Sequence, residues 1–301
     1  MKSVLITGCH GLTGQKLVEL FSGYSHNIYG IDLHQESIFQ GMAGYQYHQF
    51  DLTNRSKLLD LIEELSPDVI INTAAMTQVD ACEIEKERCW KINVDVVRYL
   101  VESARRFNMK LIHISSDYVF DGTAGPYNEL DRPNPISYYG KSKLASENLI
   151  FGGGIDSAVL RTMVLFGHGR NLKPSFVSWI VTKLREGVTI KIVTDQIGNV
   201  TLVDDLADSI HKIVTMNISG LFHVAGREII SRYDFAVNIA EAYNLNKEYI
   251  NPTITRLLGQ VAPRPLQSGL IVDKAQRELM LNFCDVDEAL RKYRKQEASF
   301  N

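Results

Sequence analysis

The 301-residue sequence predicts an α/β fold, in which a doubly wound parallel sheet is followed by a smaller C-terminal lobe. A glycine-rich turn near the N-terminus joins a short apolar run to an amphipathic helical pattern, and apolar runs then alternate with helical patterns. The run Val69-Ile70-Ile71 is apolar throughout, as expected for a strand that helices cover on both faces. Strands joined by such long crossovers lie parallel.

Composition narrows the class of protein. The chain is 45% hydrophobic and 22% charged, which is typical of a globular protein with a large core. A net charge of −3 and the absence of Lys/Arg runs argue against nucleic-acid binding. A strand pattern begins at Ser3 and no apolar run could cross a bilayer, so we expect a cytoplasmic protein without a membrane partner. The four cysteines lack Cys-x-x-Cys spacing, which favours free thiols, and no metal site is predicted.

The first strand pattern ends in Thr7-Gly8-Cys9-His10-Gly11-Leu12-Thr13-Gly14. A strand, a glycine turn and a helix in this order form the phosphate-binding opening of a Rossmann unit. The glycines let the backbone approach a pyrophosphate at the positive end of the helix. The spacing here is Gly-x-x-Gly-x-x-Gly, so Gly8, Gly11 and Gly14 are the predicted phosphate-loop glycines.

Two aspartates follow the next strand patterns. Asp32 closes the strand at 27–31, where a carboxylate accepts both ribose hydroxyls of the adenosine and repels a 2′-phosphate. Because no Arg or Lys follows closely, we expect NADH to be favoured over NADPH. Asp51 follows a strand at about 45–50, and could bond the adenine amino group or cap the helix that starts near Asn54. The sequence does not choose between these roles.

The next units lead to a group of reactive side chains. A helix at 54–65 precedes the strand at 69–71, whose small following residues, 72–75, would let a nicotinamide lie against the backbone. A long helix at about 85–107 leads to a strand at 111–114 that ends in Ser115 and Ser116. After a loop rich in Pro and Gly, a helical pattern opens with Tyr139 one turn before Lys143, so both share a helix face.

Tyrosine, lysine and a strand-end serine form a group that can reduce a carbonyl. A phenol has an ordinary pKa of about 10, and a nearby ammonium favours its ionised form. The serine hydroxyl can hold the carbonyl oxygen while a hydride arrives. The same Tyr-x-x-x-Lys spacing recurs at Tyr243 and Lys247, near a helix end without a strand hydroxyl, so we interpret that second pair as structural.

The C-terminal half is less regular. It shows strand patterns at 158–160 and 221–224, a glycine-rich loop at 166–171, and helical patterns near 175–185, 203–216, 231–243 and 285–295. We predict a dinucleotide-binding domain over 1–168 with a returning segment at about 203–225. Residues 169–202 and 226–301 then form the smaller lobe.

Taken together, these motifs resemble the extended short-chain dehydrogenase/reductase superfamily, and within it the dTDP-4-dehydrorhamnose reductase family. The resemblance covers nearly the whole chain. Its motifs are residues 8–14, 72–75 with 79–83, 115–122, 126–135 leading to 139–144, Asp195-Gln196 with Gly198, and Arg264-Pro265 with Ser268. Two substrate-side positions differ from the family pattern: Val164 replaces the usual Trp, and 198–201 reads Gly-Asn-Val-Thr instead of Gly-x-Pro-Thr.

The resemblance implies the reduction, with NAD(P)H, of the 4-keto group of a nucleotide-linked deoxysugar, with the smaller lobe binding the substrate. It assigns Ser116, Tyr139 and Lys143 to catalysis, and Ser116 and Asp117 to the sugar. Arg264 lies in a segment stiffened by two prolines, and either binds the substrate's phosphates or is a surface arginine of a Pro-rich loop. The implied cofactor contacts, besides Gly8, Gly14, Tyr139 and Lys143, are His10, Gly11, Leu12, Asp32, Asp51, Leu52, Ala74, Ala75 and Met76.

Two other functions remain open. Sugar-nucleotide epimerases use the same Tyr/Lys pair with a retained cofactor. The beta subunit of methionine adenosyltransferase resembles this family as well, and works by binding a partner enzyme. A dehydratase is disfavoured, because Tyr118 stands after Asp117 where an acidic pair is expected. If the protein assembles, we expect a homodimer.

Overall fold

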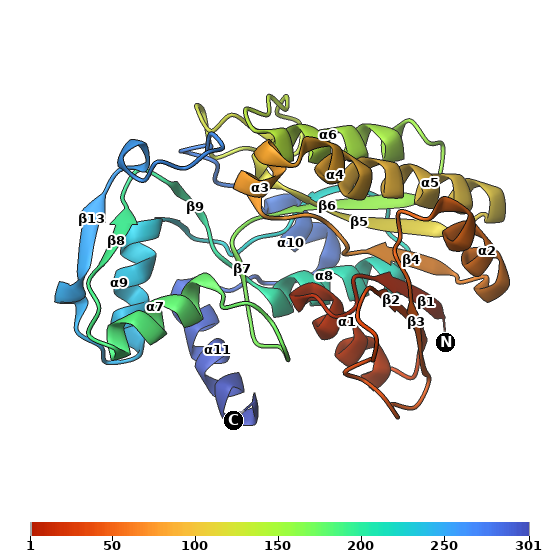
Figure 1. Ribbon diagram of the computed structural model, residues 1–301, viewed down its shortest axis with the longest axis horizontal. Helices are drawn as coiled ribbons and strands as arrows, with labels where there is room; N and C mark the ends of the chain where they lie inside the picture. Colours follow the sequence, from red (N-terminus) through yellow and green to blue (C-terminus); the bar gives the residue numbers. More distant parts are fainter. Residues whose placement is uncertain (1, 301) are drawn as a thin grey trace.

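The computed structural model describes residues 2–300, with side chains to residue 297, and confirms the predicted fold class (Figure 1). Seven parallel strands form the central sheet in the order β11-β6-β5-β4-β1-β2-β3. Their bounds are β1 Ser3–Thr7, β2 Asn27–Asp32, β3 Tyr45–Gln49, β4 Val69–Asn72, β5 Lys110–Ser116, β6 Ser157–Thr162 and β11 Gly220–His223. The order reverses at β1, which pairs with β2 on one side and β4 on the other.

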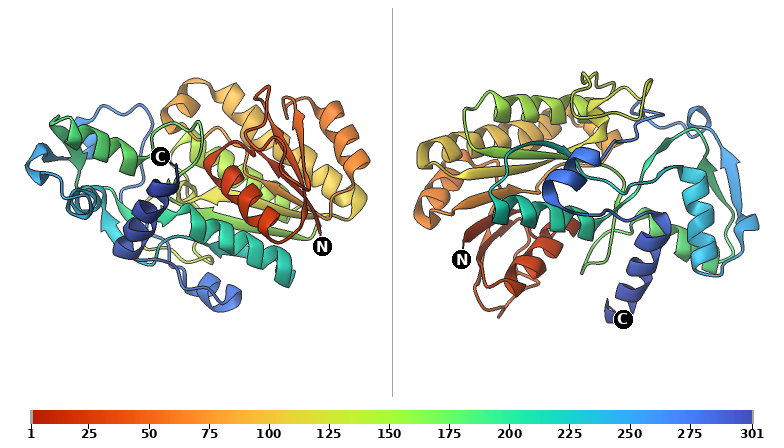
Figure 2. Two further views of the ribbon diagram at one scale, coloured as in Figure 1. Left: turned by 90° about the horizontal axis from the view of Figure 1, so that it is seen from below. Right: turned by 180° about the vertical axis from the view of Figure 1, so that it is seen from behind.

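Helices cover both faces of the sheet (Figures 1 and 2). One face carries α2 Arg55–Leu65, α5 Val96–Phe107 and α6 Tyr138–Phe151, and the other carries α1 Leu12–Gly23, α8 Val203–Met216 and α10 Asp273–Leu279. The helix predicted at about 85–107 is interrupted. It is preceded by α3 Val79–Ile84, begins as α4 Lys86–Trp90 and passes through a π-helical turn, Lys91–Asp95, into α5.

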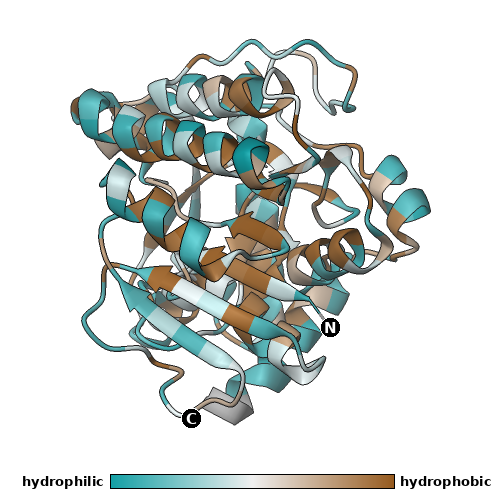
Figure 3. Ribbon diagram, turned by 90° about the vertical axis from the view of Figure 1, so that its right-hand side faces the viewer, coloured by the Kyte–Doolittle hydropathy of each residue, from teal (hydrophilic) through white to brown (hydrophobic). Residues whose placement is uncertain are grey.

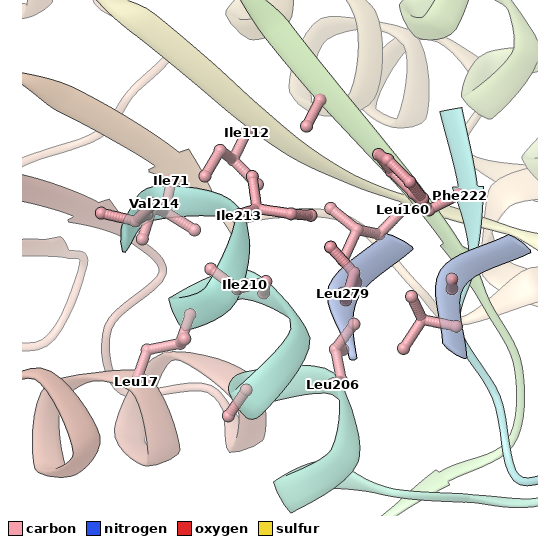
Figure 4. Packing of buried hydrophobic residues seen from close by; sticks show 14 of the residues in the cluster. Leu17, Ile71, Ile112, Leu160, Leu206, Ile210, Ile213, Val214, Phe222 and Leu279 are labelled. Atoms are coloured by element: carbon pink, nitrogen blue, oxygen red, sulfur yellow. The ribbon is translucent and has the colours of Figure 1, made fainter. Parts of the chain in front are cut away.

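Alternate strand residues enter two separate cores, because successive side chains of a strand point to opposite faces. Ile71 packs with Leu17 of α1 and Ile210 of α8, in the core that Figure 4 shows. Its neighbour Ile70 packs on the other face with Leu58 of α2. Figure 3 shows the result: the central strands are hydrophobic, whereas the outward helix faces are largely hydrophilic.

A third core lies beside the sheet, between α7 Phe176–Arg185, α9 Arg232–Ala242 and α11 Val286–Phe300. Short strand pairs join it: β8 Ile190–Val193 with β13 Ile250–Thr253, β9 Ile197–Asn199 with β12 Ile229–Ser231, and β7 Leu165–Phe166 with β10 Thr201–Leu202. Single 3₁₀ turns occupy Asp117–Val119, Lys247–Tyr249 and Thr255–Leu257. These short strand pairs were not predicted from the sequence, and the proposed lobe boundaries stay a prediction.

Two further features concern the whole chain. Cys9, Cys82, Cys89 and Cys284 are free thiols, and all four are buried. Within residues 2–300, no helix has the length and hydrophobicity that a membrane crossing requires.

The turn between β1 and α1 is closely packed. Gly8 has a φ of +68°, which favours glycine, and a Cβ added there would lie 2.9 Å from the Ala74 backbone. A Cβ on Gly14 would lie 2.2 Å from the Gly8 carbonyl oxygen. The first turn of α1 can therefore approach the end of β1 only because Gly14 has no side chain.

This packing predicts opposite effects for two glycine-to-alanine substitutions on α1. Gly14→Ala should destabilise the protein by about 1–3 kcal/mol, the usual cost of overpacking. Gly23 at the other end of the helix has open space around its Cβ position, so Gly23→Ala should be neutral or stabilising by up to about 1 kcal/mol. Urea unfolding of both variants measures the difference. Equal stabilities would show that the turn relaxes without cost.

Candidate active site

A cavity of about 460 Å³ lies at the carboxyl ends of β1, β4 and β5. This is the point of the sheet where the strand order reverses, and where open α/β sheets bind their ligands. Residues that the sequence places far apart meet in its wall: Gly11, Leu12, Thr13, Thr73, Ala75, Thr77, Val79, Ile114, Ser115, Ser116, Asp117, Tyr118, Tyr139, Lys143, Thr162, Met163, Val164 and Leu165. The glycine loop and the Ser/Tyr/Lys group thus share one cavity.

The glycine loop presents the start of a helix to this cavity. Gly11 is the N-cap of α1, and among the described residues no side chain caps it. Gly11 N donates to the Gly8 carbonyl at 3.0 Å, which closes the turn. Peptide N–H groups at an open helix start bind anions well, since they carry the positive end of the helix dipole. A cofactor pyrophosphate therefore fits the residues present.

Ser116, Tyr139 and Lys143 lie together in the cavity wall and are 7%, 8% and 2% exposed. Ser116 is the last residue of β5, and the other two come from the start of α6. The N-cap of α6 is Ser137, whose hydroxyl accepts from Gly140 N at 3.1 Å. This cap sets where the helix begins, so that Tyr139 and Lys143, four residues apart, face the strand end.

Tyr139 is positioned to hold a proton. Burial raises the pKa of its phenol, and a hydrogen bond with Ser116 opposes that rise. The phenol therefore stays protonated at neutral pH, as a proton donor must. Burial lowers the pKa of Lys143 to about 8. Within the described part of the chain, Lys143 Nζ lies 3.3 Å from His113 Nε2 and makes no hydrogen bond to Tyr139.

Asp117 is the third buried acid–base group of the site and is 3% exposed. Its carboxylate accepts from Ser116 Oγ at 2.9 Å and from Ser268 Oγ at 2.7 Å. Burial raises the pKa of Asp117 to about 6, against the effect of both serines. The bond to Ser268 joins the strand end to the C-terminal segment.

A small recess continues from Asp117 into the C-terminal part of the chain, where Gln196, Asn199, Arg232 and Ser268 contribute to its wall. Arg232 was not predicted as a site residue, because no local pattern distinguishes it from an ordinary helix-start arginine. Val164, which replaces the family Trp, also lines this recess, and its φ is +46°.

The adenosine end of the predicted cofactor site lies at the end of β2. Asp32 accepts from His10 N at 3.1 Å, from Leu33 N at 2.7 Å and from His34 Nδ1 at 2.7 Å. Burial opposes ionisation of Asp32, but these hydrogen bonds outweigh it and lower its pKa. His34 was not predicted, because the sequence after Asp32 was searched only for an Arg or Lys that could accommodate a 2′-phosphate. His10, Asp32 and His34 each offer one atom that could ligate a metal ion, and these three atoms lie within 4.8 Å of one another.

Of the remaining predicted cofactor residues, some lie in or beside the cavity wall and others lie outside it. Ala75 lines the cavity, Ala74 lies against Gly8, and Met76 N donates to Asn93 Oδ1 at 2.8 Å. Asp51 and Leu52 lie outside the cavity wall. Asp51 accepts from Thr53 N at 2.9 Å in a turn before α2, and the residue that caps α2 is Asn54.

The Arg264 side chain lies beside the cavity wall and is held there by an ion pair. Its Nη2 lies 2.9 Å from Asp80 Oδ1, and its guanidinium lies 6.0 Å from the centre of the Tyr118 ring, which does line the cavity. Among the described residues, its Nη1 is buried without a hydrogen-bond partner. Arg264 thus has one donor nitrogen to spare, next to the cavity wall.

In the second Tyr-x-x-x-Lys pair, Tyr243 packs against the third core and Lys247 is exposed, and neither residue lines the cavity. The Tyr243 hydroxyl bonds Glu297 Oε2 at 3.0 Å, and Lys247 pairs with Glu241 at 2.8 Å. Tyr243 is the C-cap of α9, so the helix ends before Lys247 and the two residues do not share a helix face.

Comparisons with known proteins place this geometry in a family. Residues 1–299 match the family described as RmlD substrate binding domain. The chain is 32% identical to dTDP-4-dehydrorhamnose reductase of Aggregatibacter actinomycetemcomitans, over 98% of this chain and 99% of the relative. It is also 32% identical to methionine adenosyltransferase 2 subunit beta of Bos taurus, over 88% of this chain and 80% of the relative.

Two solved structures are similar over nearly their full length. The dTDP-4-dehydrorhamnose reductase of Bacillus anthracis in complex with NADP has a TM-score of 0.87 and 29% identity, covering 98% of this chain and 99% of that one. A hypothetical dTDP-4-dehydrorhamnose reductase from Sulfolobus tokodaii has a TM-score of 0.83 and 36% identity, covering 96% and 99%. The chain therefore belongs to the RmlD substrate binding domain family, which is that of the dTDP-4-dehydrorhamnose reductases.

Proposed function

We propose that this protein is an NAD(P)H-dependent oxidoreductase that reduces the 4-keto group of a nucleotide-linked deoxysugar. The observation that carries the proposal is the single cavity that joins the start of α1 to Ser116, Tyr139 and Lys143. A dinucleotide held at the glycine loop would lie in the same cavity as the Tyr139 phenol. The relative solved with NADP supports a nicotinamide cofactor.

The bound cofactor supplies the hydride. The protein side chains stabilise and protonate the carbonyl oxygen, which becomes an alkoxide. Tyr139 donates its phenolic proton to the forming alkoxide. Ser116, whose hydroxyl now bonds Asp117, turns to hold the same oxygen. The Lys143 ammonium stabilises the phenolate that is left, because opposite charges attract strongly in a buried site.

The recess beside Asp117 is proposed to receive the sugar. Asp117 bonds its hydroxyl groups, and Arg232 and Arg264 supply positive charge for the diphosphate. A guanidinium suits this role because its fork of N–H donors matches phosphate oxygens.

A non-catalytic regulatory role is the second candidate. It is favoured by the similarity to methionine adenosyltransferase 2 subunit beta. Purified protein, NADH or NADPH and a 4-keto sugar nucleotide distinguish the two functions. A reductase oxidises the cofactor without further protein, whereas a regulator binds the cofactor without turnover. An epimerase would interconvert the sugar without net oxidation of the cofactor.

The first prediction for this function compares the two tyrosines. Tyr139→Phe removes the proton donor and keeps the ring, so kcat should fall about 100- to 10,000-fold, the usual contribution of general acid catalysis. Cofactor affinity should change little. Tyr243→Phe is the matched control and should keep a kcat close to wild type, because its hydroxyl bonds only Glu297. Near-normal turnover in Tyr139→Phe would remove this tyrosine from catalysis.

A second prediction concerns cofactor choice. We propose that Asp32 accepts the adenosine ribose hydroxyls and that NADH is preferred. Asp32→Ala should lower kcat/KM for NADH by about 10-fold or more, as for the loss of a hydrogen bond to a charged group. The same change should relieve the repulsion of NADPH. The ratio of kcat/KM for the two cofactors, measured in wild type and variant, checks this. An unchanged ratio excludes Asp32 from the ribose site.

A third prediction tests Arg264. Arg264→Ala should raise KM for the sugar nucleotide much more than KM for the cofactor, because a phosphate contact is lost. Arg256→Ala is the control, since Arg256 is an exposed arginine of the same C-terminal stretch. Steady-state kinetics with each substrate varied measures both constants. Equal effects on the two KM values would mean that Arg264 is structural.

A further inference from the structure

His113 lies behind the catalytic lysine and has no role in the function proposed above. It belongs to β5 and is 1% exposed. Its Nε2 lies 3.3 Å from Lys143 Nζ, and its Nδ1 lies 3.0 Å from Asn72 Nδ2. The ring thus connects Lys143 to the end of β4.

The Asn72 side of the ring determines where His113 carries its proton. The Thr7 hydroxyl donates to Asn72 Oδ1 at 2.6 Å, which leaves the amide nitrogen facing His113 Nδ1. An amide nitrogen only donates, so Nδ1 accepts. A neutral imidazole that accepts at Nδ1 carries its proton on Nε2.

The opposite side of the ring requires the same tautomer. Ser146 Oγ donates its single proton to the Lys143 carbonyl oxygen at 2.7 Å. At 3.1 Å from His113 Nε2, this hydroxyl oxygen can therefore only accept from the ring. Thr7, Asn72 and Ser146 together hold an N–H bond at Nε2.

We propose that His113 is a positioning residue for Lys143: fixed as the Nε2–H tautomer, whose proton Ser146 Oγ accepts, it denies Lys143 a lone pair at Nε2 and so favours the amine over the ammonium. An ammonium has donors only and needs acceptors around it, and a ring nitrogen that carries a proton is not an acceptor. The alternative tautomer would present a lone pair and stabilise the ammonium. The chain of three hydrogen bonds from β1 to α6 thereby adjusts the charge of the catalytic lysine.

The other groups that face Lys143 act in the opposite direction. Burial lowers its pKa, while Glu147 of α6, Cys89 of α4 and Cys82 of α3 raise it. Glu147 is itself paired with Arg161 at 2.7 Å. Burial, and then Lys143, hold the pKa of His113 well below its usual value, so the ring stays neutral.

A consequence follows that rests on the proposed reductase function. If the ammonium is the active form of Lys143, activity is present below a pH of about 8 and is lost as the pH rises through that value. Releasing His113 from its tautomer should raise the pKa of Lys143 and move this alkaline limit upward.

The direct test is independent of catalysis. Long-range ¹H–¹⁵N spectra of protein labelled with ¹⁵N-histidine show which ring nitrogen carries the proton, and His113→Asn assigns the signal by its loss. We expect Nε2–H in the wild type and no titration to imidazolium between pH 6 and pH 9. An ordinary histidine, with a pKa of about 6.5, would titrate in that range. Nδ1–H or an imidazolium in that range would overturn the proposal.

The kinetic test uses two variants that release the tautomer. Asn72→Asp places an acceptor at Nδ1, so the ring proton must move there. The alkaline limit of kcat should rise by about one pH unit, which is what one charge-assisted hydrogen bond contributes. Thr7→Val adds no charge, frees the Asn72 amide to turn and should give a smaller shift in the same direction.

Two controls separate this effect from others. Ser103→Ala removes a buried hydroxyl whose one hydrogen bond within the described residues goes to Tyr99 O on α5, and should leave the limit unchanged. Cys89→Ala removes a thiol that raises the pKa of Lys143, so it should move the limit downward, if at all. An unmoved limit in both Asn72→Asp and Thr7→Val contradicts the proposal. A protein without reductase activity would refute the proposed function, and the spectra would still test the tautomer.

Discussion

The close contact between the end of β1 and the first turn of α1 is the constraint on which the site depends. Gly14 lets the helix start against the Gly8 carbonyl, and Gly8 lets the turn lie against Ala74 after β4. These approaches place an open helix start beside the reversal of the strand order. A side chain at either position would push the helix or β4 outward and separate the anion-binding end of the cavity from its catalytic end.

Burial of Lys143 is the second condition. A buried ammonium loses its hydration, and the protein compensates only in part through Glu147, which Arg161 already neutralises. Burial therefore lowers the pKa of Lys143 to about 8, and perturbed pKa values of this kind cluster at functional sites. The polar chain from Thr7 to His113 runs beneath the strand ends and connects this lysine to the same β1 that carries the glycine loop.

The C-terminal part of the chain supplies the other wall of the site. Ser268 reaches Asp117, and Arg232 enters the recess beside it, although each lies more than ninety residues from the strand end in sequence. Val164 takes a left-handed backbone conformation in the same wall. The departures from the family pattern noted in the sequence, at Val164 and at Asn199-Val200, both lie in this wall.

The sequence by itself determined the alternation of strands and helices, the glycine turn between β1 and α1 and the facing of Tyr139 and Lys143, because each of these depends on local periodicity or on spacing within one helix. It also distinguished this pair from Tyr243 and Lys247 by the strand that precedes it. Only the tertiary structure decided the roles that depend on neighbours distant in sequence. Asn54, and not Asp51, caps α2; Asp80 engages Arg264; His34 pairs with Asp32; and His113 stands behind Lys143. Hydrogen bonds and burial between separate elements create these roles, and no local pattern records which strand ends will meet.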